Sequence, residues 1–301
     1  MNIDIKLEEL FTFETLEQGL YRGISWDLGL PAVLGGHVLG QAVVSAYKTV
    51  PATQFAHSFH SYFLLPGDAA KPVVYDVEIV RDGRSFSTRR VKAVQNGKTI
   101  FYMTISFQLV QPHIEHQYAQ CPELPHAETL PNDIDLFELK HQPLSEKLRH
   151  TLSYHRPIDI RTVEPQAMFG EEVTAPKRYI WMKSQHQLHA DVALHQAALA
   201  YASDYHFLST ALQAHPIKPN DKGIRMATID HAMWFHLPPS PPPPPTPLPF
   251  PPAHLFPPHT PQSHLHSSHP LPPPHAHPPP PLHPHRTPHH STPPPPPPAP
   301  Y

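Results

Sequence analysis

The chain changes character at Leu237, and this break limits what can fold. From Leu237 to Tyr301 the sequence is almost entirely Pro, His, Ser, Thr and Leu, and Arg286 is its one charged side chain besides histidine. Proline fixes φ and lacks the N–H that helices and sheets use, and the segment has little apolar area to offset the entropy cost of ordering. We therefore expect residues 237–301 to be a disordered tail, and the foldable part to end near His236.

The foldable part, about 236 residues, is long enough for one large domain or two small ones. The formal net charge of −3 lacks the basic excess of a nucleic-acid-binding protein, so no nucleic-acid partner is expected. The single cysteine, Cys121, excludes an internal disulfide and fits a reducing compartment. No signal peptide and no apolar run of membrane-spanning length is found. We expect a cytoplasmic protein without a membrane span, and a peroxisomal location stays open.

The first half of the foldable part predicts one helix followed by a meander of strands. After Gly35 and Gly36, apolar residues recur at spacings of three and four up to Ala46, which favours a helix with one apolar face. Strand-like segments follow at residues 56–65, 73–80, 85–95 and 98–110, and Asn96-Gly97 between the last two is a strong hairpin signal. Apolar residues alternate with polar ones through the last segment, so one face of the sheet should meet a core. This is the order of elements in a hotdog fold, in which a sheet wraps around a central helix.

The order of elements then repeats. Residues 111–146 are rich in Pro, acidic residues and His, and read as a linker. Residues 158–163 and 178–183 read as strands, 188–214 as a second helix, and 226–236 as a counterpart of 56–65. We therefore predict an α+β double hotdog. A first hotdog domain spans residues 1–110, a linker 111–146, an incomplete second hotdog domain 147–236, and a disordered tail 237–301.

Six blocks, in this order and spacing, resemble the type II acyl-CoA thioesterases, the double-hotdog thioesterase II family. The blocks are GGHVLGQAV, HSFHSYFLLPGD, YDVEIVRDGRSFSTRRV, QNGKTIFYMTISFQ, YASDYHFL and ATIDHAMWFH, and the likeness runs from about Leu7 to His236. The resemblance implies hydrolysis of fatty acyl-CoA to free fatty acid and CoA, without a metal, a cofactor or a covalent intermediate. It also implies a homo-oligomer if the second domain is intact.

The resemblance also implies a set of site residues. The family's catalytic Asp corresponds to Asp204 in YASDYHFL, and its Thr to Thr228 in ATIDHAMWFH; its catalytic Gln would lie in the region that the tail replaces and is not assigned. Asp204 would be the general base for a water molecule that Thr228 helps to orient. Gly36 and His37 could supply backbone N–H groups for the oxyanion, since they open a helix. The alternatives are a surface carboxylate at Asp204 and an ordinary strand threonine at Thr228.

Two further groups of side chains invite a binding role. The arginines Arg81, Arg84, Arg89 and Arg90 could contact the phosphates of CoA, although such a cluster beside hairpins is more often a solvated face. His57 and His60 suggest a metal site, but residues three apart on a strand point to opposite faces and cannot share one ion. We therefore expect no metal.

Two accounts of the tail remain open. In the first, the chain is an acyl-CoA thioesterase whose tail is an out-of-frame reading, because a C-rich coding strand yields Pro, His, Thr, Ser and Leu. In the second, the chain is a catalytically inactive relative, and its polyproline runs are an interaction segment for SH3- or WW-type grooves. The second account needs basic residues beside PxxP, and the tail offers only Arg286.

Overall fold

In the computed structural model, the described residues are 6–27, 32–111, 122–133, 135–136, 157–164, 177–189, 191–216 and 226–236, together with the backbone of Pro249–Leu255. They all lie in the first of two compact units, Met1–Ser268. Parts of the predicted linker, namely 112–121, 134 and 137–146, lie outside the described residues, and so does the predicted tail except for Pro249–Leu255.

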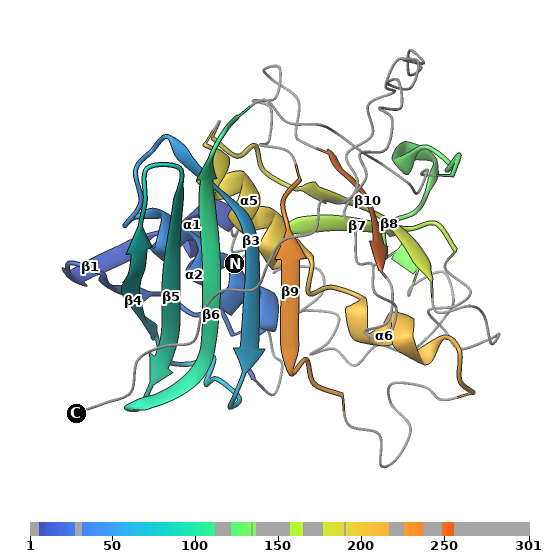
Figure 1. The fold of residues 1–301 in the computed structure, drawn as a ribbon. Helices are drawn as coiled ribbons and strands as arrows, with labels where there is room; N and C mark the ends of the chain where they lie inside the picture. Colours follow the sequence, from blue (N-terminus) through green and yellow to red (C-terminus); the bar gives the residue numbers. More distant parts are fainter. Residues whose placement is uncertain are drawn as a thin grey trace, which may run out of the picture. The chain divides into compact units, whose positions relative to one another are not determined.

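A curved antiparallel sheet encloses helix α2 (Gly35–Tyr47), as Figure 1 shows. α2 packs against strands β4, β5 and β6. Almost every residue of α2 is buried, because the sheet covers one side of the helix and a second helix covers the other. The strands, in their order across the sheet, are β1 (Phe13–Glu17), β2 (Leu20–Gly23), β4 (Val73–Asp82), β5 (Phe86–Gln95), β6 (Lys98–Leu109), β3 (Gln54–Phe63) and β9 (Asp230–Trp234).

The predicted hotdog architecture is confirmed. The helix after Gly35 forms, and the four predicted strands of the first half become β3 to β6, with pairings of β4 to β5 and of β5 to β6. The hairpin between β5 and β6 turns at Asn96-Gly97, where both residues have positive φ, as a two-residue turn of this type requires. In β6 the residues Phe101, Met103 and Ile105 face the core and are at most 1% exposed. Helix α1 (Leu7–Leu10) and strands β1 and β2 were not predicted.

The two halves meet through a helix pair and a shared sheet. α5 (Val192–Ala202) packs on α2, and β9 pairs with the free edge of β3, so one sheet runs across both halves. The helices approach closely because Gly36 and Gly40, one turn apart, face the backbone of Tyr201 and Ala197. A β-carbon at Gly36 would lie 2.2 Å from the Tyr201 oxygen, and one at Gly40 would lie 3.0 Å from the Ala197 oxygen. No side chain larger than hydrogen fits at Gly36.

A second sheet has the order β10-β8-β7, with β7 (Ile158–Thr162), β8 (Arg178–Ser184) and β10 (Pro249–Leu255). β8 lies between β7 and β10, as β2 lies between β1 and β4 in the first half. Within the predicted tail, the backbone of Pro249–Leu255 is extended and pairs with β8. Proline's φ is compatible with extended backbone, and an edge strand tolerates proline because its outer row of N–H groups needs no partner.

The second predicted helix is broken. Residues 188–214 do not form one helix, because α5 ends at Ala202 and a second helix, α6 (Phe207–Leu212), begins after a four-residue turn. The turn ends at His206, which has φ 62° and ψ −5°, the left-handed conformation. This turn carries Asp204.

Candidate active site

Asp204 lies where the turn between α5 and α6 meets the first turn of α2. Its Oδ2 accepts a hydrogen bond from the Gly36 N–H at 2.8 Å, and its Oδ1 accepts one from the Thr228 hydroxyl at 3.3 Å. The residue before α2, Leu34, offers no capping side chain, so Asp204 supplies the acceptor that this helix end needs. Three segments far apart in the sequence thus converge on one carboxylate.

The environment of Asp204 raises its pKa to about 6 from an ordinary value of 3.8. Burial is the main cause, because it disfavours the charged carboxylate; the hydrogen bonds from Gly36 and Thr228 act in the opposite direction. A carboxyl group with a pKa near 6 is ionised at neutral pH and is a stronger base than an exposed aspartate. The carboxylate can therefore accept a proton from a bound molecule near neutral pH.

The Gly36 and His37 backbone N–H groups, predicted to bind the oxyanion, both have hydrogen-bond acceptors within the protein. The Gly36 N–H donates to Asp204, and the His37 N–H donates to the Leu34 carbonyl at 3.0 Å. The His37 side chain is fully buried, its Nε2 lies 2.9 Å from the Ile24 carbonyl oxygen, and burial lowers its pKa to about 4. Gly36 therefore holds the carboxylate in this structure, and His37 ties α2 to the segment after β2.

Sequence reasoning missed His231, which lies on β9 beside the same turn. Its Nε2 is 3.0 Å from the hydroxyl of Ser203, the residue before Asp204, and its ring stacks on Phe59. Burial lowers the His231 pKa to about 4, so the ring is neutral at physiological pH. His231 therefore fixes the start of the turn from the sheet. The run of histidine and aromatic residues in ATIDHAMWFH carried the signal, but nothing in it pointed to Ser203.

The four arginines divide into two kinds. Arg89 is 1% exposed, and its guanidinium donates to Thr49 and Asp82 and to backbone carbonyls, so the prediction that it contacts a ligand phosphate is wrong. It points inward because β5 alternates and Arg89 falls on the core face. Arg81, Arg84 and Arg90 are exposed, and Arg90 pairs with Glu78.

The arginines lie at the other end of α2 from Asp204. Arg89 bonds Thr49, just beyond the last turn of α2, whereas Asp204 bonds Gly36 in the first turn. A helix of thirteen residues separates the two ends by roughly 20 Å. The structure therefore does not bring the arginines together with Asp204.

His57 and His60 do not lie on opposite faces of β3, contrary to the prediction. A register shift in β3 between Ala56 and Ser58 adds a residue to the strand, and the His57 ring bonds Ser106, whose side chain lies on the outer face with that of His60. Even so, no group of three or more residues that could hold a metal ion occurs in the described part of the chain. Nor does any helix in the described ranges combine the length and apolar character that crossing a bilayer requires.

Comparisons with known proteins cover both halves of the chain. Residues 24–108 match the family model "Acyl-CoA thioesterase N-terminal domain", and residues 147–242 match the model "Acyl-CoA thioesterase". The chain is 37% identical to acyl-CoA thioesterase 2 of Haemophilus influenzae, over 77% of this chain and 81% of that protein. It is 38% identical to acyl-coenzyme A thioesterase 8 of Mus musculus, over 78% and 75% of the two chains.

Solved structures show the same likeness. The crystal structure of an acyl-CoA thioesterase II from Mycobacterium marinum superposes with a TM-score of 0.58 and 36% identity, over 77% of this chain and 78% of that one. A thioesterase II from Thermobifida fusca, described as putative, superposes with a TM-score of 0.59 at 17% identity and supports the fold alone.

Proposed function

Because this chain belongs to the acyl-CoA thioesterase family, a family of thioester hydrolases, we propose that it hydrolyses fatty acyl-CoA with Asp204 as the general base. The observation that carries the proposal is the half-buried Asp204 carboxylate, held between Gly36 and Thr228 with its pKa raised to about 6. Each carboxylate oxygen keeps a second lone pair, so a water molecule can donate to Asp204 while both protein hydrogen bonds persist.

The reaction then needs one proton acceptor, and no covalent bond forms between the protein and the acyl group. Asp204 removes a proton from the water as the water oxygen bonds to the thioester carbonyl carbon, and the carbonyl electrons move onto oxygen. Collapse of the tetrahedral intermediate breaks the carbon–sulfur bond, and the protonated Asp204 returns the proton to the departing thiolate. The products are a fatty acid and CoA with a free thiol. Thr228 orients the carboxylate, and its hydroxyl oxygen can also accept a hydrogen bond from the water.

A direct assay tests this proposal. The purified full-length chain is mixed with palmitoyl-CoA, and the free thiol is measured with a colorimetric thiol reagent. We expect steady thiol release that is proportional to the concentration of the chain. Folded protein that releases no thiol from acyl-CoA of any chain length would contradict the proposal and would favour an inactive relative.

For the CoA part of the substrate, Arg81 and Arg84 remain in the proposal as phosphate contacts. Both are exposed beside the turn from β4 to β5, and guanidinium groups bind phosphate well. Since they lie near the opposite end of α2 from Asp204, an extended CoA would have to span roughly 20 Å over the protein surface to reach both, because α2 itself is enclosed.

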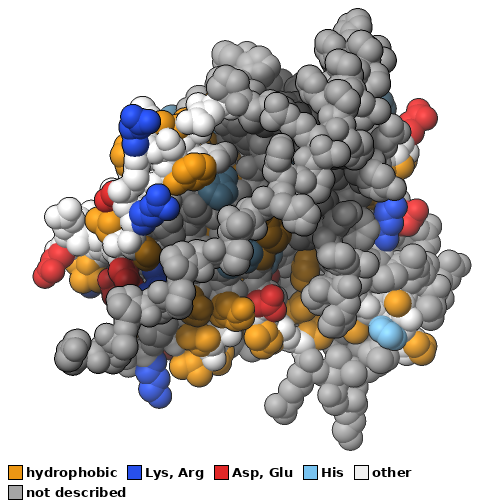
Figure 2. All heavy atoms as spheres, in the orientation of Figure 1, with side chains coloured by type: hydrophobic (Ala, Val, Ile, Leu, Met, Phe, Trp, Pro, Cys, Tyr) orange, Lys and Arg blue, Asp and Glu red, His pale blue; other side chains and the backbone are white. Residues whose placement is uncertain are grey.

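For the acyl part, an apolar surface adjoins the site. Figure 2 shows apolar side chains gathered over the lower ends of β3 and β9. Ile229, next to Thr228, is 63% exposed, and its carbonyl accepts from the Phe63 N–H at 2.8 Å. Phe63 in turn lies beside Gly35, at the start of α2, where a β-carbon would come within 3.0 Å of its ring and 2.7 Å of Asp204. We name the exposed residues here the apolar rim: Leu64, Leu65, Met226 and Ile229.

We expect the Ile229→Ser variant to discriminate between acyl chains. Contact with the apolar rim would stabilise a long chain, and the loss of several carbon atoms should lower kcat/KM for palmitoyl-CoA by about tenfold. Butanoyl-CoA, which is too short to cover the rim, should be affected less than about twofold. Thiol release across a series of chain lengths measures both effects.

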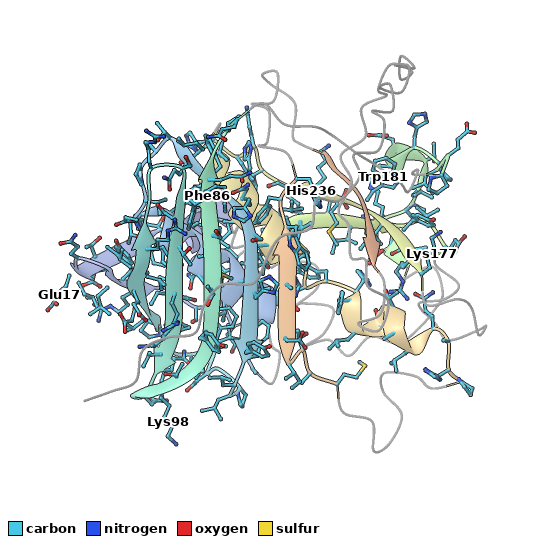
Figure 3. All side chains as sticks on the ribbon, in the orientation of Figure 1. Glu17, Phe86, Lys98, Lys177, Trp181 and His236 are labelled. Atoms are coloured by element: carbon cyan, nitrogen blue, oxygen red, sulfur yellow. The ribbon has the colours of Figure 1, made fainter. Side chains whose placement is uncertain are left out.

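Phe86→Ser is the matched control for this prediction. Phe86 is another exposed large apolar residue, and Figure 3 shows it at the opposite end of the sheet from Lys98, the first residue of β6. The apolar rim adjoins the Lys98 end, where the Leu64 and Leu65 N–H groups donate to the Ile100 carbonyl. This variant should keep the chain-length profile of the unchanged protein. Equal losses for long and short substrates in Ile229→Ser would contradict a role for the rim in acyl binding.

A further inference from the structure

The turn that carries Asp204 has an unusual backbone. It runs from Ser203 to His206, between α5 and α6, and His206 has φ 62°. Residues with a β-carbon rarely adopt this left-handed conformation, because the β-carbon crowds the following carbonyl. Among the described residues, the other non-glycine residue with positive φ is Asn96, in a hairpin turn where Asn is well suited. Surrounding contacts must therefore hold His206 in place.

Those contacts come from a buried cluster of charged and polar side chains. The His206 Nε2 lies 2.7 Å from the Asp133 Oδ2, a close polar contact that is not aligned as a hydrogen bond. On the other side of the ring, Nδ1 accepts from the Arg178 guanidinium at 3.2 Å. Asp133 and Arg178 are 1% and 2% exposed, so both charges are shielded from water and compensate one another.

The cluster is itself anchored. The second oxygen of Asp133 accepts from the Thr162 hydroxyl at 3.0 Å, on β7. Arg178, on β8, also donates to the Ser209 hydroxyl at 2.9 Å, and that hydroxyl donates to the His206 carbonyl at 2.9 Å. His206 is therefore held through both its side chain and its backbone, from the second sheet and from the segment that connects the two halves.

We propose that Asp133, His206 and Arg178 form a positioning network that fixes the turn and so aims the Asp204 carboxylate at Gly36 and Thr228. Ser203, at the start of the turn, is tied to His231 on β9, and His206, at its end, is tied to this network. With both ends fixed, the backbone of Asp204 is held at the position from which its carboxylate reaches Gly36 and Thr228. The inference rests on the proposed role of Asp204 as the general base, and it gives the connecting segment, through Asp133, a part in the site.

The test uses two substitutions at His206 and one control. His206→Ala keeps a β-carbon in the left-handed conformation but removes both side-chain contacts. His206→Asn also removes them, yet asparagine adopts this conformation more readily, so this variant protects the fold. Asn96→Ala places an alanine in the same conformation far along the chain from Asp204, and it should cost a similar loss of melting temperature. Neither Asp133 nor Arg178 is substituted, because each change would leave an unpaired buried charge.

The first readout is the Asp204 carboxyl pKa, measured by ¹³C NMR with labelled aspartate and assigned with Asp204→Asn. We expect a pKa near 6 in the unchanged protein and in Asn96→Ala. In both His206 variants it should fall by about one to two pH units, because a released carboxylate turns toward water. The second readout is thiol release, in which kcat should fall by about ten- to a hundredfold in the His206 variants, with KM little changed.

The outcomes separate the two proposals. An unchanged Asp204 pKa in a folded His206→Asn variant would overturn the positioning role, whether or not the chain is active. The same change in pKa or kcat in Asn96→Ala as in His206→Ala would also overturn it, since the effect would then follow from lost stability alone. Absence of thiol release in the unchanged protein would overturn the proposed function, while the NMR titration would still decide the positioning of Asp204.

Discussion

Asp204→Asn should abolish nearly all thiol release from acyl-CoA. The amide has almost the same shape as the carboxylate, and its oxygen can still accept the hydrogen bond from Gly36, but it cannot accept a proton from water at neutral pH. General-base catalysis contributes about two to four orders of magnitude, so we expect kcat to fall by roughly 10³-fold. KM should change little, because in the proposed mechanism Asp204 acts on the water and not on CoA. The measurement is steady-state thiol release at pH 8.

The stability of the same variant checks that activity is not lost through unfolding. Asp204 has a pKa of about 6 in the folded protein, against 3.8 as its ordinary value, so its ionisation opposes folding. The free energy of unfolding of the unchanged protein should therefore fall as pH rises from about 4 to 6 through this group, and stay level above that. Asparagine does not ionise, so Asp204→Asn should be more stable than the unchanged protein by about 1–3 kcal/mol at pH 8. Inactivity together with lower stability at pH 8 would contradict the assignment.

Gly36→Ala should have the largest effect on stability. The new β-carbon would lie 2.2 Å from the Tyr201 oxygen and 3.1 Å from the Tyr201 carbonyl carbon, both of which belong to the backbone of α5. Neither atom can move without separating α2 from α5, so we expect a loss of about 3 kcal/mol or more. For a folded part of this size the melting temperature should fall by about 6–12 °C. Moving α2 away from α5 would also break the hydrogen bond from the Gly36 N–H to Asp204, so activity should fall together with stability.

Gly67→Ala is the matched control for this packing argument. A β-carbon there would lie 3.1 Å from Ile100 Cδ1 and 3.3 Å from Val33 Cγ2, both at the ends of side chains that can shift by a few tenths of an ångström. The change should cost less than about 1 kcal/mol and leave thiol release intact. Thermal unfolding monitored by circular dichroism compares the two. A Gly36→Ala variant that melts within 2 °C of the unchanged protein would refute the close contact between α2 and α5.

Much of the fold could be predicted because its signals are local. The apolar spacing after Gly35 and the alternation in residues 98–110 each report one buried face, and Asn96-Gly97 defines its own turn. The resemblance then indicated Asp204 and Thr228, and the structure brings both side chains together. Neither composition nor periodicity would have paired two residues from different elements.

The errors share one physical cause, which is that long-range contacts override local patterns. Residues 203–206 contain no Gly or Pro, so nothing local predicted that the second helix would break there; buried partners hold the turn instead. The extra residue in β3 is a property of strand pairing, and it moved His57 to the face of His60. Nothing in the local sequence indicated that Arg89 is buried. Its hydrogen-bond acceptors are oxygens of Thr49 and of the neighbouring strand β4, which only the folded chain brings to it.

The proposed attack by water, with Asp204 as its base and not as a nucleophile, is tested most directly by a single turnover in H₂¹⁸O, with the chain in excess over palmitoyl-CoA. If water attacks the thioester with Asp204 as its base, the fatty acid released in the first turnover carries one ¹⁸O atom, and Asp204 carries none. Mass spectrometry of the fatty acid and of the Asp204 peptide reads both results. Unlabelled fatty acid with ¹⁸O in Asp204 would show that the carboxylate itself attacks the thioester, and would contradict the mechanism.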